Sequence, residues 1–138
     1  MIVVDVNVLA YLFISGTYTE GARATFLKDP EWCVPQLWRS ELRSVLSLYM
    51  RKRQLSADDA LRVMDEAEAI VEGREYRVSS ADVFALVPGS GCSAYDCEYV
   101  ALAKHLQVRL VTSDRQVLRA FPRVALSPQE FAGQRTKG

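Results

Sequence analysis

The sequence predicts an α/β protein, a three-layer α/β/α sandwich around a central, mainly parallel sheet of four to five strands. Short apolar runs alternate with longer segments of helical periodicity, which is typical of a parallel sheet covered by helices. The first run, Ile2–Val4, is β-branched and contains no polar residue, as expected for a strand buried on both faces. Because the chain has 138 residues and contains no linker or repeat, we expect a single domain over residues 1–138.

Caps and helix breakers predict where the elements begin and end. Ser56 with Asp59 three residues later is a capping box, and Gly73 stops the helix that this box opens. Pro30 and Pro35 bracket a short strand and limit its length. The expected strands cover residues 2–4, 32–34, 75–78, 109–112 and 124–126. The expected helices cover residues 6–14, 20–28, 37–54, 56–72, 79 to near 88, 95–106, 115–121 and a last turn after 127. We also expect a flexible loop over residues 88–93 and a frayed carboxyl end over residues 133–138.

Composition narrows the classes of function. The 17 basic and 17 acidic residues give a net charge of zero, so any binding to nucleic acid must come from a local patch. Three cysteines, Cys33, Cys92 and Cys97, have neither zinc-site nor redox spacing, and we expect reduced thiols in a cytoplasmic protein. We find no signal peptide and no apolar stretch long enough to span a bilayer, so no membrane partner is expected.

Four carboxylates are the candidate functional residues. Asp5 and Asp114 each follow an apolar strand, and parallel strands deliver such residues to one edge of the sheet, where α/β proteins bind ligands. Asp96 opens a later helix, and Glu41 lies in the first turns of another, on the edge of its apolar stripe. Each acid also has a purely structural interpretation, because an aspartate that caps a helix stabilises it by about 1 kcal/mol.

The four acids together predict a metal site. Two carboxylates roughly 5 Å apart repel by about 3 kcal/mol at an effective dielectric of about 20, which exceeds the capping energy. Either the acids lie apart, or a divalent cation that prefers oxygen ligands, Mg²⁺ or Mn²⁺, lies between them. Such an ion supports hydrolysis of a phosphodiester. Zinc is disfavoured because the only histidine, His105, lies far from any cysteine cluster. One histidine and the absence of a glycine-rich phosphate loop also disfavour other chemistries.

Three segments of the chain resemble the PIN domain, and in particular the single-domain VapC-type toxins of toxin–antitoxin pairs. They are VVDVNVLAY (3–11), WRSELRSVLSLY (38–49) and YDCEYVALAKHLQVRLVTSDRQVL (95–118). The resemblance implies a PIN-like sandwich and a Mg²⁺- or Mn²⁺-dependent endoribonuclease. It also implies the toxin role in a type II toxin–antitoxin system, with RNA as substrate, a cognate antitoxin as partner and a homodimer as the assembly.

The resemblance also implies roles for individual residues. Asp5 and Asp96 would be the principal metal ligands, and Glu41 and Asp114 would hold waters or a second ion. Asn7 and Thr112 would orient these groups, so that six catalytic residues are expected. Many relatives carry a further acid shortly after the last aspartate, whereas residues 115–118 here are Arg, Gln, Val and Leu. Whether one or two metal ions bind therefore stays open.

Basic residues near the acids are candidates for contact with RNA. Arg39 and Arg43 lie one turn apart on the predicted helix that carries Glu41, and Arg115 directly follows Asp114. Two other functions compete with the nuclease. One is a PIN-like module that binds RNA or protein without cutting. The other is a haloacid-dehalogenase-like phosphatase, which is disfavoured because its motif has an aspartate at the position of Asn7.

Overall fold

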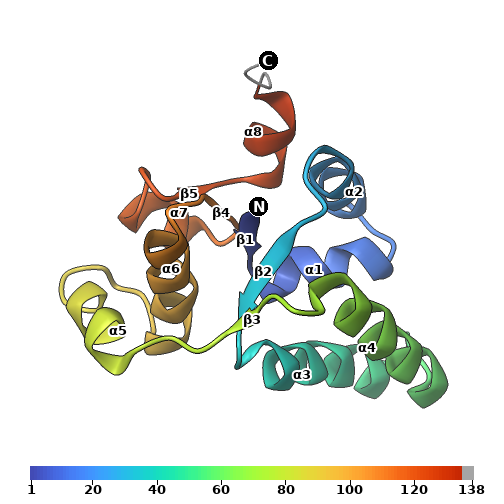
Figure 1. The fold of residues 1–138 in the computed structure, drawn as a ribbon. Helices are drawn as coiled ribbons and strands as arrows, with labels where there is room; N and C mark the ends of the chain where they lie inside the picture. Colours follow the sequence, from blue (N-terminus) through green and yellow to red (C-terminus); the bar gives the residue numbers. More distant parts are fainter. Residues whose placement is uncertain (135–138) are drawn as a thin grey trace.

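The computed structural model describes residues 1–134, in which helices flank a five-stranded sheet of order β3-β2-β1-β4-β5 (Figure 1). Every neighbouring pair of strands is parallel, which confirms the predicted sandwich with its parallel sheet. The central strand, β1, is the amino-terminal apolar run. The strands are β1 (Ile2–Val4), β2 (Trp32–Pro35), β3 (Glu75–Tyr76), β4 (Leu110–Val111) and β5 (Ala125–Leu126).

The helices form two layers over this sheet. In Figure 1, α1–α4 and α8 lie on one side and α5–α7 on the other. Ile2 and Val4 pack into the core of the first layer and Val3 into that of the second, so β1 is buried on both faces as predicted. The helices are α1 (Val6–Phe13), α2 (Thr19–Lys28), α3 (Trp38–Arg51), α4 (Ala57–Val71), α5 (Ser80–Leu86), α6 (Ala94–Leu106), α7 (Arg115–Ala120) and α8 (Pro128–Gly133).

Some elements are shorter than predicted. The helix expected over 37–54 ends at Arg51, because Arg53 adopts a left-handed backbone with φ of 57°. The strand expected over 75–78 stops at Tyr76, where its neighbour β2 ends at Pro35. At the carboxyl end, Gly133 closes α8, and residues 135–138 of the predicted frayed end lie outside the described residues.

The segment predicted as a flexible loop, 88–93, is held by hydrogen bonds. The Ser90 hydroxyl donates to the Val87 carbonyl at 2.9 Å, and the Cys92 amide donates to the Ser90 hydroxyl at 3.1 Å. The Gln116 side chain, from α7, donates to the Ser90 carbonyl at 2.9 Å. Gly91 has a φ of 69°, and a Cβ there would lie 2.5 Å from Gln116 Nε2, so this approach requires glycine.

The register of the sheet sets up the site. Val4 on β1 lies beside Val111 on β4, and both strands end there. The next residues, Asp5 and Thr112, therefore leave the sheet side by side at its carboxyl edge. None of the helices in residues 1–134 is both long and apolar enough to cross a bilayer.

Candidate active site

All four predicted acids line one cavity of about 60 Å³ at the carboxyl edge of the sheet. They reach it from the starts of α1, α3, α6 and α7, which are far apart in the chain. We call this cavity the acid pocket. Its polar lining consists of Asp5, Asn7, Glu41, Asp96, Tyr99, Thr112 and Asp114, so it also includes the two residues that the resemblance assigned to orientation.

Asp5 caps α1 and lines the pocket at the same time. Its Oδ1 accepts a hydrogen bond from the Val8 amide at 3.0 Å, and its Oδ2 accepts one from the Thr112 hydroxyl. Burial raises the pKa of Asp5 to about 6, although both hydrogen bonds favour the ionised carboxylate, and the negative charge of Asp114 raises this pKa further. Ionisation of Asp5 therefore lowers the stability of the folded, metal-free protein.

Thr112 connects Asp5 to Asp114. Its side chain is 1% exposed, and its Oγ1 accepts a hydrogen bond from the Asp114 amide at 3.1 Å while its hydroxyl proton is donated to Asp5. Asp114 in turn caps α7, because its Oδ1 accepts from the amides of Gln116 and Val117 at 2.9 and 3.1 Å. The side chain of Thr112 thus fixes two of the acids relative to each other.

Asp96 is placed by a capping box at the start of α6. Its amide donates to the Ser93 hydroxyl at 3.1 Å, and the Ser93 amide donates to Asp96 Oδ2 at 3.4 Å. The structural interpretation of these aspartates is therefore compatible with the functional one: Asp5, Asp96 and Asp114 stabilise the starts of their helices, and all three side chains line the acid pocket.

Glu41 has a partner that the sequence analysis missed. The Tyr99 hydroxyl donates to Glu41 Oε1 at 2.7 Å, and Tyr99 is only 4% exposed. Burial raises the pKa of Glu41, with the charges of Asp5 and Asp96 adding to the effect. Burial together with the neighbouring Glu41 also raises the pKa of Tyr99, so its hydroxyl stays a donor. One signal in the sequence could have pointed to Tyr99: it lies three residues after Asp96 on the same helix, so the two side chains share a face.

Replacing Tyr99 with phenylalanine is expected to reduce activity at the acid pocket by about ten-fold. The ring and its packing remain, but Glu41 loses a charge-assisted hydrogen bond of the kind that contributes about 1.5–3 kcal/mol. The measurement is the pH dependence of cleavage, in which we expect the rise in activity to move to higher pH because Glu41 ionises less readily. An unchanged profile would mean that Tyr99 only fills space.

The donor set fits a hard divalent cation. The pocket presents carboxylate, amide and hydroxyl oxygens, the ligands that Mg²⁺ and Mn²⁺ prefer. Two of its acids, Asp5 and Glu41, have raised pKa values that positive charge would lower. Among residues 1–134, no group of three His, Cys, Asp or Glu side chains is arranged closely enough to hold an ion.

The three arginines proposed for RNA contact lie outside the acid pocket. Arg39 pairs with Glu68 at 2.6 Å and Glu75 at 2.7 Å, which holds its guanidinium against α4 and β3. This placement does not support the expectation that Arg39 contacts RNA.

Arg43 is exposed and lines a separate apolar cavity between α3 and α4. Arg115 is exposed at the first position of α7, directly after Asp114, and stays the best placed of the three.

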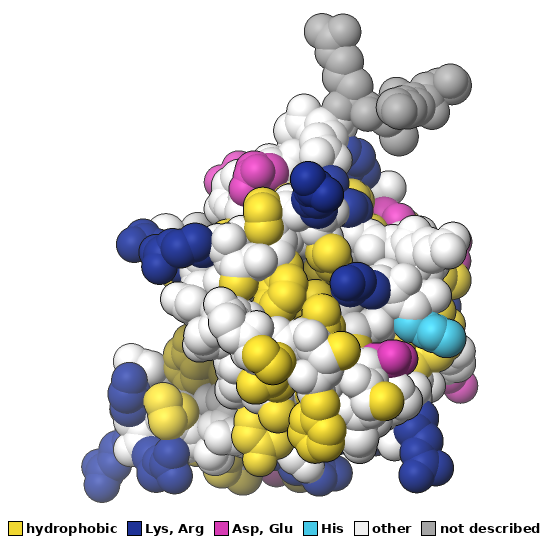
Figure 2. All heavy atoms as spheres, turned by 90° about the vertical axis from the view of Figure 1, so that its left-hand side faces the viewer, with side chains coloured by type: hydrophobic (Ala, Val, Ile, Leu, Met, Phe, Trp, Pro, Cys, Tyr) yellow, Lys and Arg dark blue, Asp and Glu magenta, His cyan; other side chains and the backbone are white. Residues whose placement is uncertain are grey.

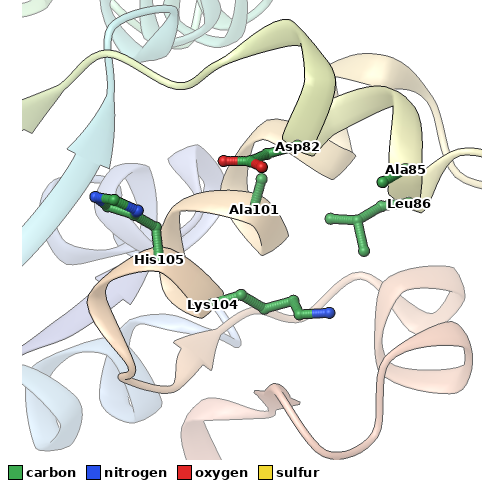
Figure 3. Close-up of a pocket in the computed structure, with 6 residues that line it drawn as sticks. All are labelled: Asp82, Ala85, Leu86, Ala101, Lys104 and His105. Carbon is green, nitrogen blue, oxygen red and sulfur yellow. The ribbon is translucent and has the colours of Figure 1, made fainter.

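His105 lies in a different part of the molecule. It lines a cavity of about 290 Å³ between α5 and α6, where Figure 3 shows it near Asp82 and Lys104. None of the four acids contributes to this cavity. Figure 2 looks onto this side of the molecule and shows hydrophobic side chains gathered on it. On the same layer, Phe84 and Tyr95 are 67% and 65% exposed, as is common where proteins contact one another.

Comparisons with known proteins agree with this architecture. The family model described as PIN domain matches residues 2–125. The chain is 29% identical over 124 residues to Ribonuclease VapC3 of Pyrobaculum aerophilum, covering 88% of this chain and 95% of that protein. Its fold is similar to the crystal structure of PAE2754 from Pyrobaculum aerophilum, with a TM-score of 0.67, 18% identity, and 94% and 92% of the two chains covered. The family match spans most of the chain, and the chain therefore belongs to the PIN-domain family.

Proposed function

We propose that this protein is an endoribonuclease that requires Mg²⁺ or Mn²⁺ and hydrolyses phosphodiester bonds of RNA. The observation that carries the proposal is the convergence of Asp5, Glu41, Asp96 and Asp114 on one pocket. Membership of the PIN-domain family and similarity to a relative named as a ribonuclease support it. The all-oxygen lining supports the choice of metal.

Each side chain has a proposed task in this reaction. Asp5 and Asp96 would bind the ion, which supplies an activated water and neutralises charge on the phosphodiester. Glu41 and Asp114 would hold waters or a second ion. Thr112 orients Asp5 through its hydroxyl, and Asn7 would orient neighbouring groups. Arg115, at the rim, would contact the RNA backbone. Attack by water leaves a 5′-phosphate and a 3′-hydroxyl.

We further propose a biological setting for this activity. Similarity to Ribonuclease VapC3 supports the toxin role in a type II toxin–antitoxin system, with a cognate antitoxin as partner. The exposed apolar side chains on the α5–α6 side support association into a homodimer. The three cysteines are free and buried, which supports action in the reducing cytoplasm.

Cleavage of a labelled RNA pool in Mg²⁺, Mn²⁺ or EDTA tests the proposal. We expect cleavage with either ion, none in EDTA, and products that carry 5′-phosphate ends. Products with cyclic phosphates would contradict hydrolysis by water, because such ends arise from attack by the ribose 2′-hydroxyl. If no RNA is cut and calorimetry detects no Mn²⁺ binding, the protein is a binding module instead.

A further inference from the structure

Two larger cavities lie beyond the acid pocket along α1 and α3, which pack side by side. Asn7 lines both the acid pocket and a second cavity of about 270 Å³. Tyr49 lines both that second cavity and a third one of about 470 Å³. The shared residues place the three cavities next to one another in a row, which we call the α1–α3 track. It leads from the four carboxylates to the carboxyl end of α3.

The sizes of the cavities decide what can occupy each of them. The acid pocket, with about 60 Å³, is too small to hold a nucleoside. A nucleotide whose phosphate lies at the acids must therefore place its base outside the pocket. The adjoining cavity of about 270 Å³ begins at Asn7 and is large enough for a base.

The lining of the second cavity is suited to a nucleotide. Tyr11 and Tyr49 are partly buried and contribute aromatic rings from α1 and α3. Tyr11 already stacks on Tyr18, with ring centroids 4.8 Å apart and Tyr18 50% exposed. Lys52 adds an exposed positive charge at the far end. Aromatic faces combined with a cation along a groove are the features with which proteins bind single-stranded nucleic acid.

We propose that the α1–α3 track binds a single-stranded segment of the RNA, with one base stacked on Tyr11 or Tyr49 and Lys52 on a backbone phosphate. This inference rests on the proposed function, because it takes the acid pocket as the site of the scissile phosphate. A base enters the track only when it is unpaired, so the nucleotide that contacts Tyr11 or Tyr49 must be single-stranded. Helical spacing places Tyr49 on the same apolar stripe of α3 as Trp38 and Leu42. Those two residues are fully buried, whereas Tyr49 is partly buried and lines the track.

Binding of labelled RNA in EDTA tests the track without cleavage. We expect a mixed-sequence single strand to bind more tightly than the same sequence in a duplex. Tyr49→Ala should weaken binding by about ten-fold, as expected for loss of one stacking contact. Tyr49→Phe, which keeps the ring, should bind like wild type. A thermal midpoint for each variant shows whether the fold is retained.

A charge variant tests the track independently of folding, because Lys52 is exposed. Lys52→Gln should lower the slope of log affinity against log salt by about 0.7, the value for one phosphate contact on a single strand. The matched control is Lys104→Gln, an exposed lysine in the α5–α6 cavity, for which no change is expected.

The outcomes separate this inference from the proposed function. If the wild type cleaves RNA but the Tyr49→Ala and Lys52→Gln variants bind it as tightly as the wild type does, the track is overturned and the nuclease stands. The track is also overturned if the wild type binds the duplex as tightly as the single strand. If RNA binds through Tyr49 and Lys52 but is never cut with Mg²⁺ or Mn²⁺, the nuclease is overturned and the track stands. If the wild type binds no RNA in EDTA but cuts it with Mg²⁺ or Mn²⁺, the track is overturned and the nuclease stands. If it neither binds nor cuts RNA, both are overturned, and a peptide segment becomes the occupant to test.

Discussion

Asp5→Asn is expected to reduce RNA cleavage by at least about a hundred-fold while making the metal-free protein more stable. Changes to groups that merely support metal ligands cost about 10–100-fold in affinity or activity, so loss of a proposed ligand should cost no less. Asparagine caps helices as well as aspartate does, and its side-chain oxygen can still accept from the Val8 amide. The fold should therefore survive the change.

The gain in stability follows from the pKa of Asp5. Because that pKa is raised from 3.8 to about 6, the folded protein binds the proton more tightly than the unfolded chain does. The free energy of unfolding then falls as pH rises from about 4 to about 6, by up to about 3 kcal/mol. Asparagine carries no charge, so the variant should be more stable than wild type above pH 6 and similar to it below pH 4.

Urea unfolding in EDTA at both ends of this pH range measures the effect, and calorimetric titration with Mn²⁺ measures ion binding. Wild type should bind Mn²⁺ and the variant should not. Equal stability at neutral pH together with unchanged cleavage would show that Asp5 only caps α1. That result would remove the acid pocket as the active centre.

Thr112→Val is expected to destabilise the protein by about 1–3 kcal/mol and to reduce cleavage by about ten-fold or more. Valine has nearly the same shape, but it leaves the Asp114 amide without its acceptor and Asp5 without a donor. Loss of that donor also raises the pKa of Asp5 further, since the hydrogen bond favours the ionised form. The deficit in stability should thus be largest above pH 6.

Thr112→Ser is the matched control, because it keeps the hydroxyl and removes only a methyl group. Unfolding by urea and cleavage of RNA should both place it close to wild type. If serine is damaging and valine is not, the role of Thr112 is packing of its methyl group in the core, where the residue is 1% exposed.

Much of the fold could be predicted from local signals. The unbroken apolar run Ile2–Val4 identifies the central strand, and the capping serines Ser56, Ser79 and Ser93 mark where helices begin. Strand order and the exact ends of β3 and β4 depend on which neighbour each strand finds, and no local pattern contains that information.

The acids of the candidate site could be predicted because their positions beside strands and helix starts are visible in the sequence. Contacts between side chains that only packing brings together could not be predicted in this way. Asp5 and Asp114 could be found because each follows a strand, and the structure places both in the acid pocket. The donor to Glu41 was missed, because Tyr99 lies 58 positions from Glu41 in the chain and its spacing from Asp96 was the only signal. Arg39 looked available for RNA, and only the fold brings Glu68 and Glu75 against it.

The bond from Gln116 to the Ser90 carbonyl has a consequence for ion selectivity. It ties the segment that leads into α6 to the first turn of α7, and these two helices carry Asp96 and Asp114. This bond links the segments that carry the two carboxylates from outside the pocket, and we expect it to restrict the distance between them. Sites of restricted span favour small ions with strict octahedral geometry over larger ones such as Ca²⁺. An uncharged amide that touches no ion would thereby limit which ion the proposed metal site accepts.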